Sequence, residues 1–580
     1  MRRPIPLFAL ALLLPLMAGT QVEAAVAPAV RQAQAERVAL IERIAPSVVA
    51  IFAHGGQGGG SGVLVTADGY AVTNFHVVQG LGGFMKCGLN DGKVYDAVLV
   101  GIDPTGDVAL IRLLGREDFP HATIGNSDAV RVGDWAYALG NPFLLATDFQ
   151  PTVTYGMVSG VHRYQYPAGT FLEYTDCIQV DTSINPGNSG GPLFNEAGEL
   201  IGINGRISVE KRGRVNVGAG YAISINQVVN FMDHLRSGRI VDHATLGATV
   251  VSRSDGTVGV TSILEMSEAF RRGLRSGDEL ISFAGRPIRS VNQFKNILGI
   301  YPKGWKLPLS YRRDGERHDI YVRLRGLHSR AEIAGGPQRP EPQPQPQPQP
   351  GPEDEDGEPR PQPRLPDPFH QQPKAEPPAD YAHMYEERAG YANYYFNRIE
   401  RDRLVSTFDA WGDFAGKSGL WEILGTVKGR QPFHFKLGGE LLAIQTGDDI
   451  ALQRLDEDFA DVPEGTGGLL AAMFQLKQLL VAPEDYFTEF YYVGSEPLDG
   501  YGERVDVLIT TRGLVTSRWY FSKADGHLIG FDTSVVDDVD PCEIRFQGES
   551  SFGEYRLPAS FVVRYGDEVV GEFVIEDVRL

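Results

Sequence analysis

The chain has 580 residues, of which 42% are hydrophobic and 22% are charged, and it carries a formal net charge of -20 at pH 7. A chain of this length and apolar content can bury several cores, so we expect a modular protein of about three or four domains. The acidic balance argues against a nucleic-acid partner, because a surface that follows phosphates needs clustered Lys and Arg.

Cysteine and histidine usage predicts neither a metal site nor a disulfide framework. The three cysteines, Cys87, Cys177 and Cys542, and the twelve histidines lack the paired spacing that such sites need. Cys87 and Cys177 fall in one region and could form a single bridge, although buried free thiols are the simpler interpretation. We expect no metal and no cofactor.

Residues 1–24 have the pattern of a secretory signal peptide. A charged start precedes a short apolar run over residues 7–17, and small residues follow near Ala24. The run is shorter than the roughly 20 residues that a membrane-spanning helix needs. We therefore expect export and cleavage after about Ala24, with an uncleaved anchor as the alternative.

Residues 36–237 are predicted to form two packed antiparallel β-barrels. A helical pattern at the start of this region is ended by Pro46. Short strand-like segments then alternate with Gly, Asp and Asn turns to about residue 224, as in barrel proteins. A helix over residues 226–235 is expected to close the domain.

His76 and Asp107 are the candidate general base and its partner. His76 ends an alternating apolar run that begins at Ala71, and Asp107 opens a strand that continues through Ile111. A carboxylate beside an imidazole fixes the tautomer of the ring and stabilises its protonated form. This pair would suit a base that activates a hydroxyl nucleophile.

Ser189 is the candidate nucleophile, in the glycine-rich stretch of residues 185–193. A serine hydroxyl is a poor nucleophile and needs both a base and a group of donors that stabilises the oxyanion. The surrounding glycines permit a tight turn, which would aim the amides of Gly187 and Ser189, with a contribution from Asn188, into one oxyanion hole. The order His, Asp, Ser is that of the chymotrypsin-like double β-barrel.

These motifs resemble those of the Deg/HtrA serine proteases. The segments 73–78, 107–110 and 187–193 carry the resemblance, and segments 61–65, 140–143, 152–159 and 216–223 extend it in the same order. The resemblance implies a mainly β, chymotrypsin-like double β-barrel and a homotrimer built through the protease domains. It also implies unfolded or misfolded proteins of the bacterial cell envelope as substrates.

The sequence also allows an expectation about specificity. In this fold the residue six places before the nucleophile lies at the base of the substrate side-chain pocket, and here it is Ser183. A trypsin-like preference for Lys or Arg would need a carboxylate there. With a neutral Ser183 and a pocket wall expected at Ile201, Gly202 and Ile203, we predict cleavage after small or medium aliphatic residues.

Residues 242–326 resemble a PDZ domain. The expected carboxylate-binding loop is Leu246, Gly247 and Ala248, because successive amides can hold a chain terminus while the next strand accepts a peptide as an added strand. The sequence departs from the family pattern at Glu268 and Arg272. We predict binding of peptide termini, with a packing module as the alternative.

The rest of the chain is expected to be a linker and a further domain. The Pro/Gln-rich residues 335–379 cannot bury a core and are predicted to be an extended, disordered linker. Residues 380–580 are predicted to form an α+β domain with an antiparallel curved sheet, beginning with a helix capped by Asp380. Near-helical spacing in this first helix is shown by a largely aromatic set: Tyr381, Tyr385, Ala392, Tyr395 and Ile399. This region weakly resembles the LolA-like half-barrel of lipoprotein carriers, and a general α+β adaptor domain is the alternative.

Together these features predict an exported, ATP-independent serine endopeptidase of the periplasm or the secreted fraction. Two other classes are also considered. The protein could be a PDZ-based client-binding chaperone or scaffold with secondary proteolysis, or it could handle lipid or lipoprotein through its C-terminal domain.

Overall fold

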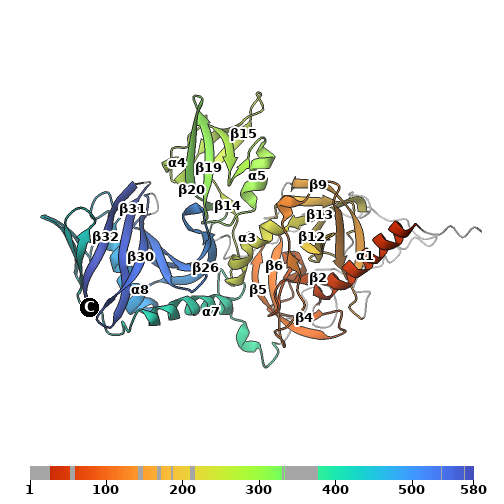
Figure 1. Cartoon of the computed structure of the whole chain (residues 1–580), viewed down its shortest axis with the longest axis horizontal. Helices are drawn as coiled ribbons and strands as arrows, with labels where there is room; N and C mark the ends of the chain where they lie inside the picture. Colours follow the sequence, from red (N-terminus) through yellow and green to blue (C-terminus); the bar gives the residue numbers. More distant parts are fainter. Residues whose placement is uncertain are drawn as a thin grey trace, which may run out of the picture.

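The computed structural model describes residues 27–52, 59–141, 148–165, 172–184, 187–209, 216–329, 332, 377–536, 539–566 and 568–580, with the backbone alone for 206–209 and 216–218. The expected signal peptide and nearly all of the expected linker lie outside these residues. Three units are visible in Figure 1: a barrel unit (residues 27–241), a middle unit (242–329) and a C-terminal unit (377–580). None of the described helices has the length and apolar content to span a membrane.

The first half of the barrel unit is a closed antiparallel barrel of six strands in the order β1-β2-β3-β6-β5-β4. Its strands are β1 (Val48–Phe52), β2 (Gly59–Leu64), β3 (Tyr70–Thr73), β4 (Phe84–Gly88), β5 (Val94–Asp103) and β6 (Val108–Leu113). Helix α1 (Pro28–Ile44) and the turn η1 (Ala45–Ser47) precede it, and the single-turn helix α2 (Phe75–Val78) follows β3. Pro46 lies in η1, at the predicted end of the first helix.

The second half of the barrel unit is also a ring of six strands, β11-β8-β9-β10-β13-β12, closed by the pairing of β11 with β12. Its strands are β8 (Trp135–Gly140), β9 (Thr152–Gln165), β10 (Tyr174–Val180), β11 (Pro192–Asn195), β12 (Glu199–Val209) and β13 (Asn216–Ser224). The short strand β7 (Thr123–Ile124) adds to β12, and η2 (Ser127–Ala129) follows it. The predicted double β-barrel is confirmed.

Helix α3 (Ile225–Arg236) closes the barrel unit, within one residue of its predicted bounds at each end. Val228, Phe231 and Leu235 are buried at helical spacing, so one face of the helix packs on the barrels. Cys87 and Cys177 are free and buried in two different hydrophobic clusters, which agrees with free thiols rather than a bridge.

The middle unit is a small antiparallel sheet in the order β15-β16-β17-β19-β20, with two helices against it. Its elements are β14 (Ala244–Thr245), β15 (Ala248–Ser252), β16 (Val258–Ile263), α4 (Glu268–Arg271), β17 (Glu279–Phe283), β18 (Arg286–Pro287), α5 (Val291–Gly299), β19 (Lys306–Arg313), β20 (Glu316–Arg323) and β21 (Arg325–Gly326). Phe283, Phe294 and Ile297 are among the buried side chains that join sheet and helix. Strand β15 is an edge strand.

The C-terminal unit is one antiparallel sheet of eleven strands in the order β25-β24-β23-β22-β32-β31-β30-β29-β28-β27-β26. Its strands are β22 (Trp421–Val427), β23 (Pro432–Leu437), β24 (Leu441–Thr446), β25 (Asp449–Arg454), β26 (Glu489–Pro497), β27 (Arg504–Arg512), β28 (Val515–Ser522), β29 (Leu528–Ser534), β30 (Cys542–Phe552), β31 (Tyr555–Tyr565) and β32 (Glu568–Arg579). Its helices and turns are η4 (Ala382–Met384), α7 (Tyr394–Val405), η5 (Ser406–Ala410), α8 (Leu469–Val481), α9 (Pro483–Tyr486) and η6 (Leu498–Gly500).

Helix α8 occupies the concave side of this sheet. It contacts β23 and β24 as well as β29, which are well separated in the sheet order, so the sheet must curve around it. Nearly all of its side chains are buried, including Leu470, Phe474 and Leu479. The space in which a half-barrel carrier would hold a lipid is therefore filled here by the helix.

The start of the C-terminal unit differs from the prediction. No helix begins at Asp380; instead α7 begins at Tyr394, and the side chain of Asn393 caps it by accepting a hydrogen bond from the Tyr395 amide. The Asn393 amide group donates to the Leu99 carbonyl at 2.8 Å, and Phe396 packs into the core of the barrel unit. The aromatic residues expected to lie on one helix are thus partly an irregular segment that returns to the first barrel.

Ion pairs join the middle unit to the C-terminal unit. The partly buried Arg323 lies 2.7 Å from Glu496 and 3.1 Å from Asp532, and the removal of its guanidinium from water is outweighed by Tyr520 and these carboxylates, so its pKa is raised. Arg272, one of the two positions that depart from the PDZ pattern, pairs with Asp540 at 2.7 Å. These residues hold the two units together.

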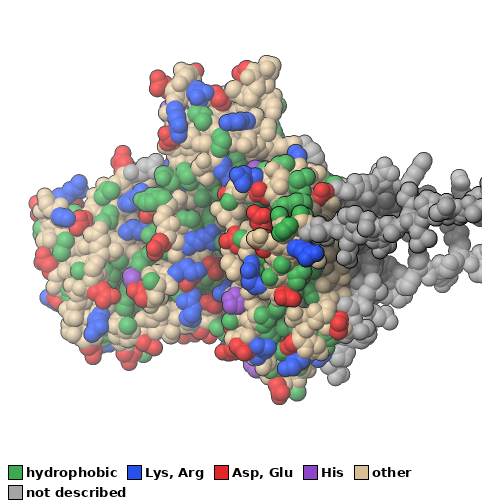
Figure 2. Space-filling model, turned by 45° about the vertical axis from the view of Figure 1, so that its right-hand side comes forward, with side chains coloured by type: hydrophobic (Ala, Val, Ile, Leu, Met, Phe, Trp, Pro, Cys, Tyr) green, Lys and Arg blue, Asp and Glu red, His purple; other side chains and the backbone are tan. Residues whose placement is uncertain are grey.

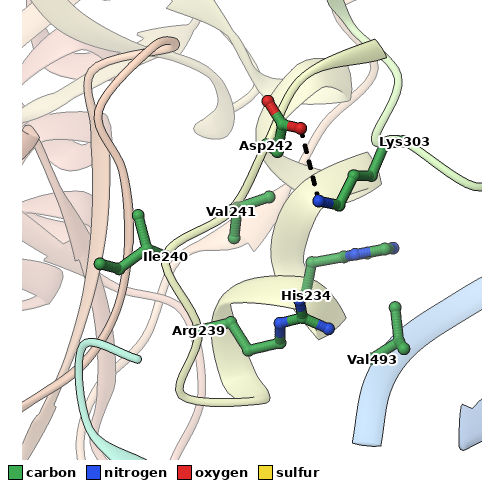
Figure 3. Close-up of a pocket in the computed structure, with 7 residues that line it drawn as sticks. All are labelled: His234, Arg239, Ile240, Val241, Asp242, Lys303 and Val493. Carbon is green, nitrogen blue, oxygen red and sulfur yellow. Dashed lines mark ion pairs between the residues drawn. The ribbon is translucent and has the colours of Figure 1, made fainter. Parts of the chain in front are cut away.

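The three units meet around a small cavity (Figure 3). It is lined by His234, Arg239, Ile240, Val241, Asp242, Lys303 and Val493. Lys303 of the middle unit lies 3.4 Å from the buried carboxylate of Asp242. Burial lowers the pKa of His234 to about 3, which keeps this ring neutral.

Candidate active site

His76 and Asp107 lie together between β3, α2 and β6. The Nδ1 atom of His76 is 2.8 Å from Oδ2 of Asp107 and 3.0 Å from Oδ1. The backbone amide of His76 also donates to Oδ1 at 3.0 Å. With Nδ1 donating to the carboxylate, Nε2 of His76 carries the lone pair and can act as a base.

Asp107 is held by the backbone as well as by its side chain. Its φ is 57°, a left-handed conformation that costs a non-glycine residue about 1–2 kcal/mol. Its carbonyl accepts hydrogen bonds from the Phe75 amide at 3.2 Å and from Asn74 Nδ2 at 2.9 Å. These two bonds connect the short helix that carries His76 to the turn that carries Asp107. They hold the strained conformation of the turn at the point where the two side chains pair.

A third donor to the Asp107 carboxylate comes from the second barrel. The hydroxyl of Tyr174, on β10, donates to Oδ2 at 2.5 Å, and the tyrosine side chain is buried. Gly205 on β12 makes room for this ring, because a Cβ there would lie 2.8 Å from Tyr174 Cε1. The carboxylate is thus held from both barrels.

The pKa of His76 is raised above its ordinary value of 6.5. Partial removal of the ring from water lowers this pKa, but the charge of Asp107 and its hydrogen bond together raise it by more. The result is a stronger base than a free imidazole.

Ser189 lies in the turn between β10 and β11, and this turn approaches the segment that leads into His76, since a Cβ on Gly190 would lie 3.0 Å from the Asn74 amide nitrogen. Its hydroxyl makes a long hydrogen bond of 3.5 Å to the Gly205 carbonyl, and this is the partner recorded for it among the described residues, rather than the His76 ring. A bond of that length is weak. Rotation about a single side-chain bond redirects the hydroxyl, and apo geometry in catalytic sites is often loose.

The predicted oxyanion residues form the turn before and at the nucleophile. Gly187 has a φ of 102°, which only glycine adopts without strain. Within the described residues, the amides of Gly187 and Ser189 have no acceptor, so both are available to an incoming oxyanion. The side chain of Asn188 is fully buried, so its contribution to the hole would come from its backbone amide.

Ser61 on β2 supports this turn. Its hydroxyl donates to the Gly187 carbonyl at 2.7 Å and accepts from the Asn141 amide at 2.9 Å. Its own amide donates to the Ser189 carbonyl at 2.9 Å. Ser61 therefore holds the two peptide groups that directly follow those carrying the Gly187 and Ser189 amides, and so supports the turn.

The predicted pocket wall needs a correction. Ile201 and Ile203 are 1% and 0% exposed and lie in two different hydrophobic clusters of the barrel unit, so their side chains do not face an open pocket. Gly202 lies between them on β12. The pairing of β11 with β12 shifts register here, since Leu193 pairs with Gly202 but Phe194 pairs with Leu200, and this irregularity lets Ile201 and Ile203 enter different clusters. On β12 it is Gly205 that lies next to the nucleophile, since its carbonyl accepts the hydrogen bond from the Ser189 hydroxyl. Ser183, the predicted base of the pocket, is exposed.

The predicted PDZ loop has the geometry of a tight turn. Gly247 has a φ of 75°, its amide donates to Thr245 Oγ1 at 3.1 Å, and its carbonyl accepts from the Leu264 amide at 2.8 Å. Leu246 is buried and Ala248 begins β15. Because β15 is an edge strand and contacts α5, an extended peptide could add to it beside this helix.

Sequence reasoning missed Tyr174, Ser61 and Gly205. Tyr174 is one of 23 tyrosines and is 67 residues from Asp107 along the chain. Nothing in its local sequence separates it from an ordinary core residue. Ser61 lies in a segment that the sequence comparison singled out, and a buried serine in a glycine-rich strand is the signal that could have identified it.

Comparison with known proteins gives consistent matches to the first half of the chain. Residues 60–203 match the trypsin-like peptidase domain family. The periplasmic serine endoprotease DegP of Escherichia coli (strain K12) is 38% identical over 298 residues, covering 47% of this chain and 60% of that protein. A probable periplasmic serine endoprotease DegP-like of Chlamydia trachomatis is 36% identical over 275 residues, covering 45% of this chain and 53% of that protein.

Among solved structures, the HtrA-type protease AlgW with a decapeptide is 27% identical, and the match covers 50% of this chain and 98% of that chain with a TM-score of 0.40. The chain spans between half and two thirds of the length of the two curated relatives above.

Proposed function

We propose that the N-terminal half of this chain belongs to the Deg/HtrA family of trypsin-like serine proteases, and that the protein is an exported, ATP-independent serine endopeptidase. The observation that carries the proposal is the His76–Asp107 pair, together with the turn of Ser189, where the Gly187 and Ser189 amides have no acceptor among the described residues. The curated relatives are named as periplasmic, which supports the bacterial periplasm as the location.

In the proposed reaction, Ser189 Oγ attacks the peptide carbonyl carbon while His76 Nε2 takes its proton. The oxyanion that forms is stabilised by the amides of Gly187 and Ser189. His76 then gives the proton to the leaving amine, and water hydrolyses the acyl-enzyme by the same steps in reverse. Asp107 remains ionised throughout and holds the imidazolium.

The proposed substrates are unfolded or misfolded envelope proteins, cut after small or medium aliphatic residues. An extended chain can reach a serine on a surface turn, whereas a folded one buries its backbone. The neutral Ser183 offers no carboxylate for Lys or Arg. The open edge of β15 supports capture of peptide termini by the middle unit.

A homotrimer built through the barrel units is also part of this proposal. Figure 2 shows apolar side chains exposed on the barrel unit. The large apolar residues exposed on its second barrel include Val132, Trp135, Tyr155 and Met157. Apolar residues gathered in this way are typical of contact surfaces.

The test uses an unfolded protein such as reduced casein. Wild type should release peptides with mainly Val, Ala or Leu before the cleaved bond, and Ser189→Ala should release none. Peptides cut equally by both proteins, or cuts mainly after Lys or Arg, would contradict the proposal. Binding of casein by both with no cleavage by either would favour the client-binding alternative.

A further inference from the structure

The free edge of the large sheet at β25 carries two exposed apolar side chains. In the described part of the chain β25 pairs with β24 on one side and with no strand on the other. Ile450 and Leu452 are 62% and 55% exposed. Proteins usually protect such an edge with charge, proline or a covering segment, because unpaired backbone groups and apolar side chains attract another strand.

The backbone N–H and C=O groups that point to the free edge of β25 belong to the same residues as its exposed apolar side chains. The Leu455 amide donates to the Glu440 carbonyl at 3.1 Å, so the odd-numbered residues of this segment point their backbone groups toward β24. In an antiparallel pair these directions alternate along the strand. Ile450, Leu452 and Arg454 therefore offer their N–H and C=O groups at the free edge, while the side chain of Ala451 packs on the core side.

The strand is self-complementary in one register. A two-fold axis normal to the sheet sets residues of the same face opposite each other. Centred on Ala451, it places Ile450 opposite Leu452 of the second copy and brings Asp448, in the turn just before β25, to the end of the strand where Arg454 of the second copy lies. Centring on Ile450 or on Leu452 instead places an apolar side chain opposite a charged one.

We propose that β25 is a self-association surface, on which a second copy of this chain pairs antiparallel through the register centred on Ala451. The pairing joins two eleven-stranded sheets into one and covers Ile450 and Leu452 in both copies. Arg454 already lies 2.7 Å from Asp456 of its own chain, so Asp448 of the second copy extends an existing cluster of charges. The edge lies at the left end of the molecule in Figure 1, remote from the barrel unit, so it is available whatever the barrel units do.

The first test is a disulfide in the full chain, made in the Ser189→Ala background to prevent self-digestion. At the two-fold axis Ala451 faces itself in a non-hydrogen-bonded pair with a Cα separation of about 4.5 Å, which suits a disulfide. Ala451→Cys should therefore oxidise to a covalent dimer. The matched control Ala443→Cys, one strand further in, should remain reduced, and the three native cysteines are buried. Equal crosslinking of the two variants would overturn the proposal.

The second test is the mass of the assembly by sedimentation. Leu452→Lys should reduce the mass to that of the assembly held by the barrel units alone, while Val569→Lys, at a position 63% exposed on β32 of the same sheet, should leave it unchanged. Asp448→Arg and Arg454→Asp should each weaken association about tenfold, and the double variant should restore it, as expected for exposed ion pairs formed twice. An unchanged mass in Leu452→Lys would refute the self-pairing. So would a failure of the double variant to restore association, which is the result expected if β25 pairs with an unrelated strand.

Discussion

Replacing Tyr174 with Phe removes a single hydroxyl from the candidate active site. This hydroxyl donates to Asp107 Oδ2 at 2.5 Å from a buried position, and it is one of three donors to the carboxylate, with the amide and Nδ1 of His76. A hydrogen bond to a charged group contributes about 1.5–3 kcal/mol. Without this bond Asp107 positions the His76 ring less well. If roughly half of the hydrogen-bond energy is lost from transition-state stabilisation in this way, kcat falls about 10-fold, since about 1.4 kcal/mol corresponds to one factor of ten.

The same substitution should change the pH profile. With one donor fewer, the negative charge of Asp107 is shared less, so the pKa of His76 rises further and the acid limb of kcat/KM moves to higher pH. KM should change little, because the hydroxyl does not contact substrate.

The assay is hydrolysis of a fluorogenic peptide across pH, with thermal unfolding as a check on folding. Tyr164→Phe is a matched control, because its hydroxyl donates to the carboxylate of Glu173 rather than to Asp107. Wild-type kcat and an unshifted profile in Tyr174→Phe would refute the assigned positioning role. So would an equal loss of activity in the two tyrosine variants.

Four further outcomes follow from the same contacts. Ser61→Ala should lower kcat about 10-fold with little change in KM, since the turn behind the oxyanion amides loses its support. The acid limb of wild-type kcat/KM should lie above pH 6.5, because the pKa of His76 is raised. His243 is 2.8 Å from buried Asp103; burial lowers its pKa, but this carboxylate raises it by more. The ionic contribution to stability is then full below the ordinary pKa of 6.5 and is lost as pH rises through the folded-state value, so His243→Gln should destabilise more near pH 5.5 than near pH 9 in urea unfolding. Lys477→Met should destabilise the C-terminal unit by about 3 kcal/mol, because three backbone carbonyls lose their donor; a gain in stability would contradict this.

The barrels and the pairing of His76 with Asp107 were predictable because their signals are local. Turn glycines, alternating strands and the motifs around His76, Asp107 and Ser189 each occupy a few consecutive residues. The α3 helix was placed within one residue at each end for the same reason, since its buried positions recur at helical spacing.

Other features depend on contacts between distant segments. The side chains of Ile201 and Ile203 read as a pocket wall by position in the chain, but the closure of β12 between β11 and β13 buries them. The aromatic residues after Asp380 suggested one helix, but several of them are taken up by the first barrel. Tyr174 reaches Asp107 only because the two barrels pack against each other.

Covalent labelling of the intact protein by a serine-directed fluorophosphonate, located by mass spectrometry, reports directly on the reactivity of Ser189. We expect one adduct, on Ser189, formed quickly in wild type and at least 100-fold more slowly in His76→Ala. Labelling of Ser189 at the same rate in both proteins, or its absence from wild type, would contradict the claim that His76, Asp107 and Ser189 act as one catalytic unit.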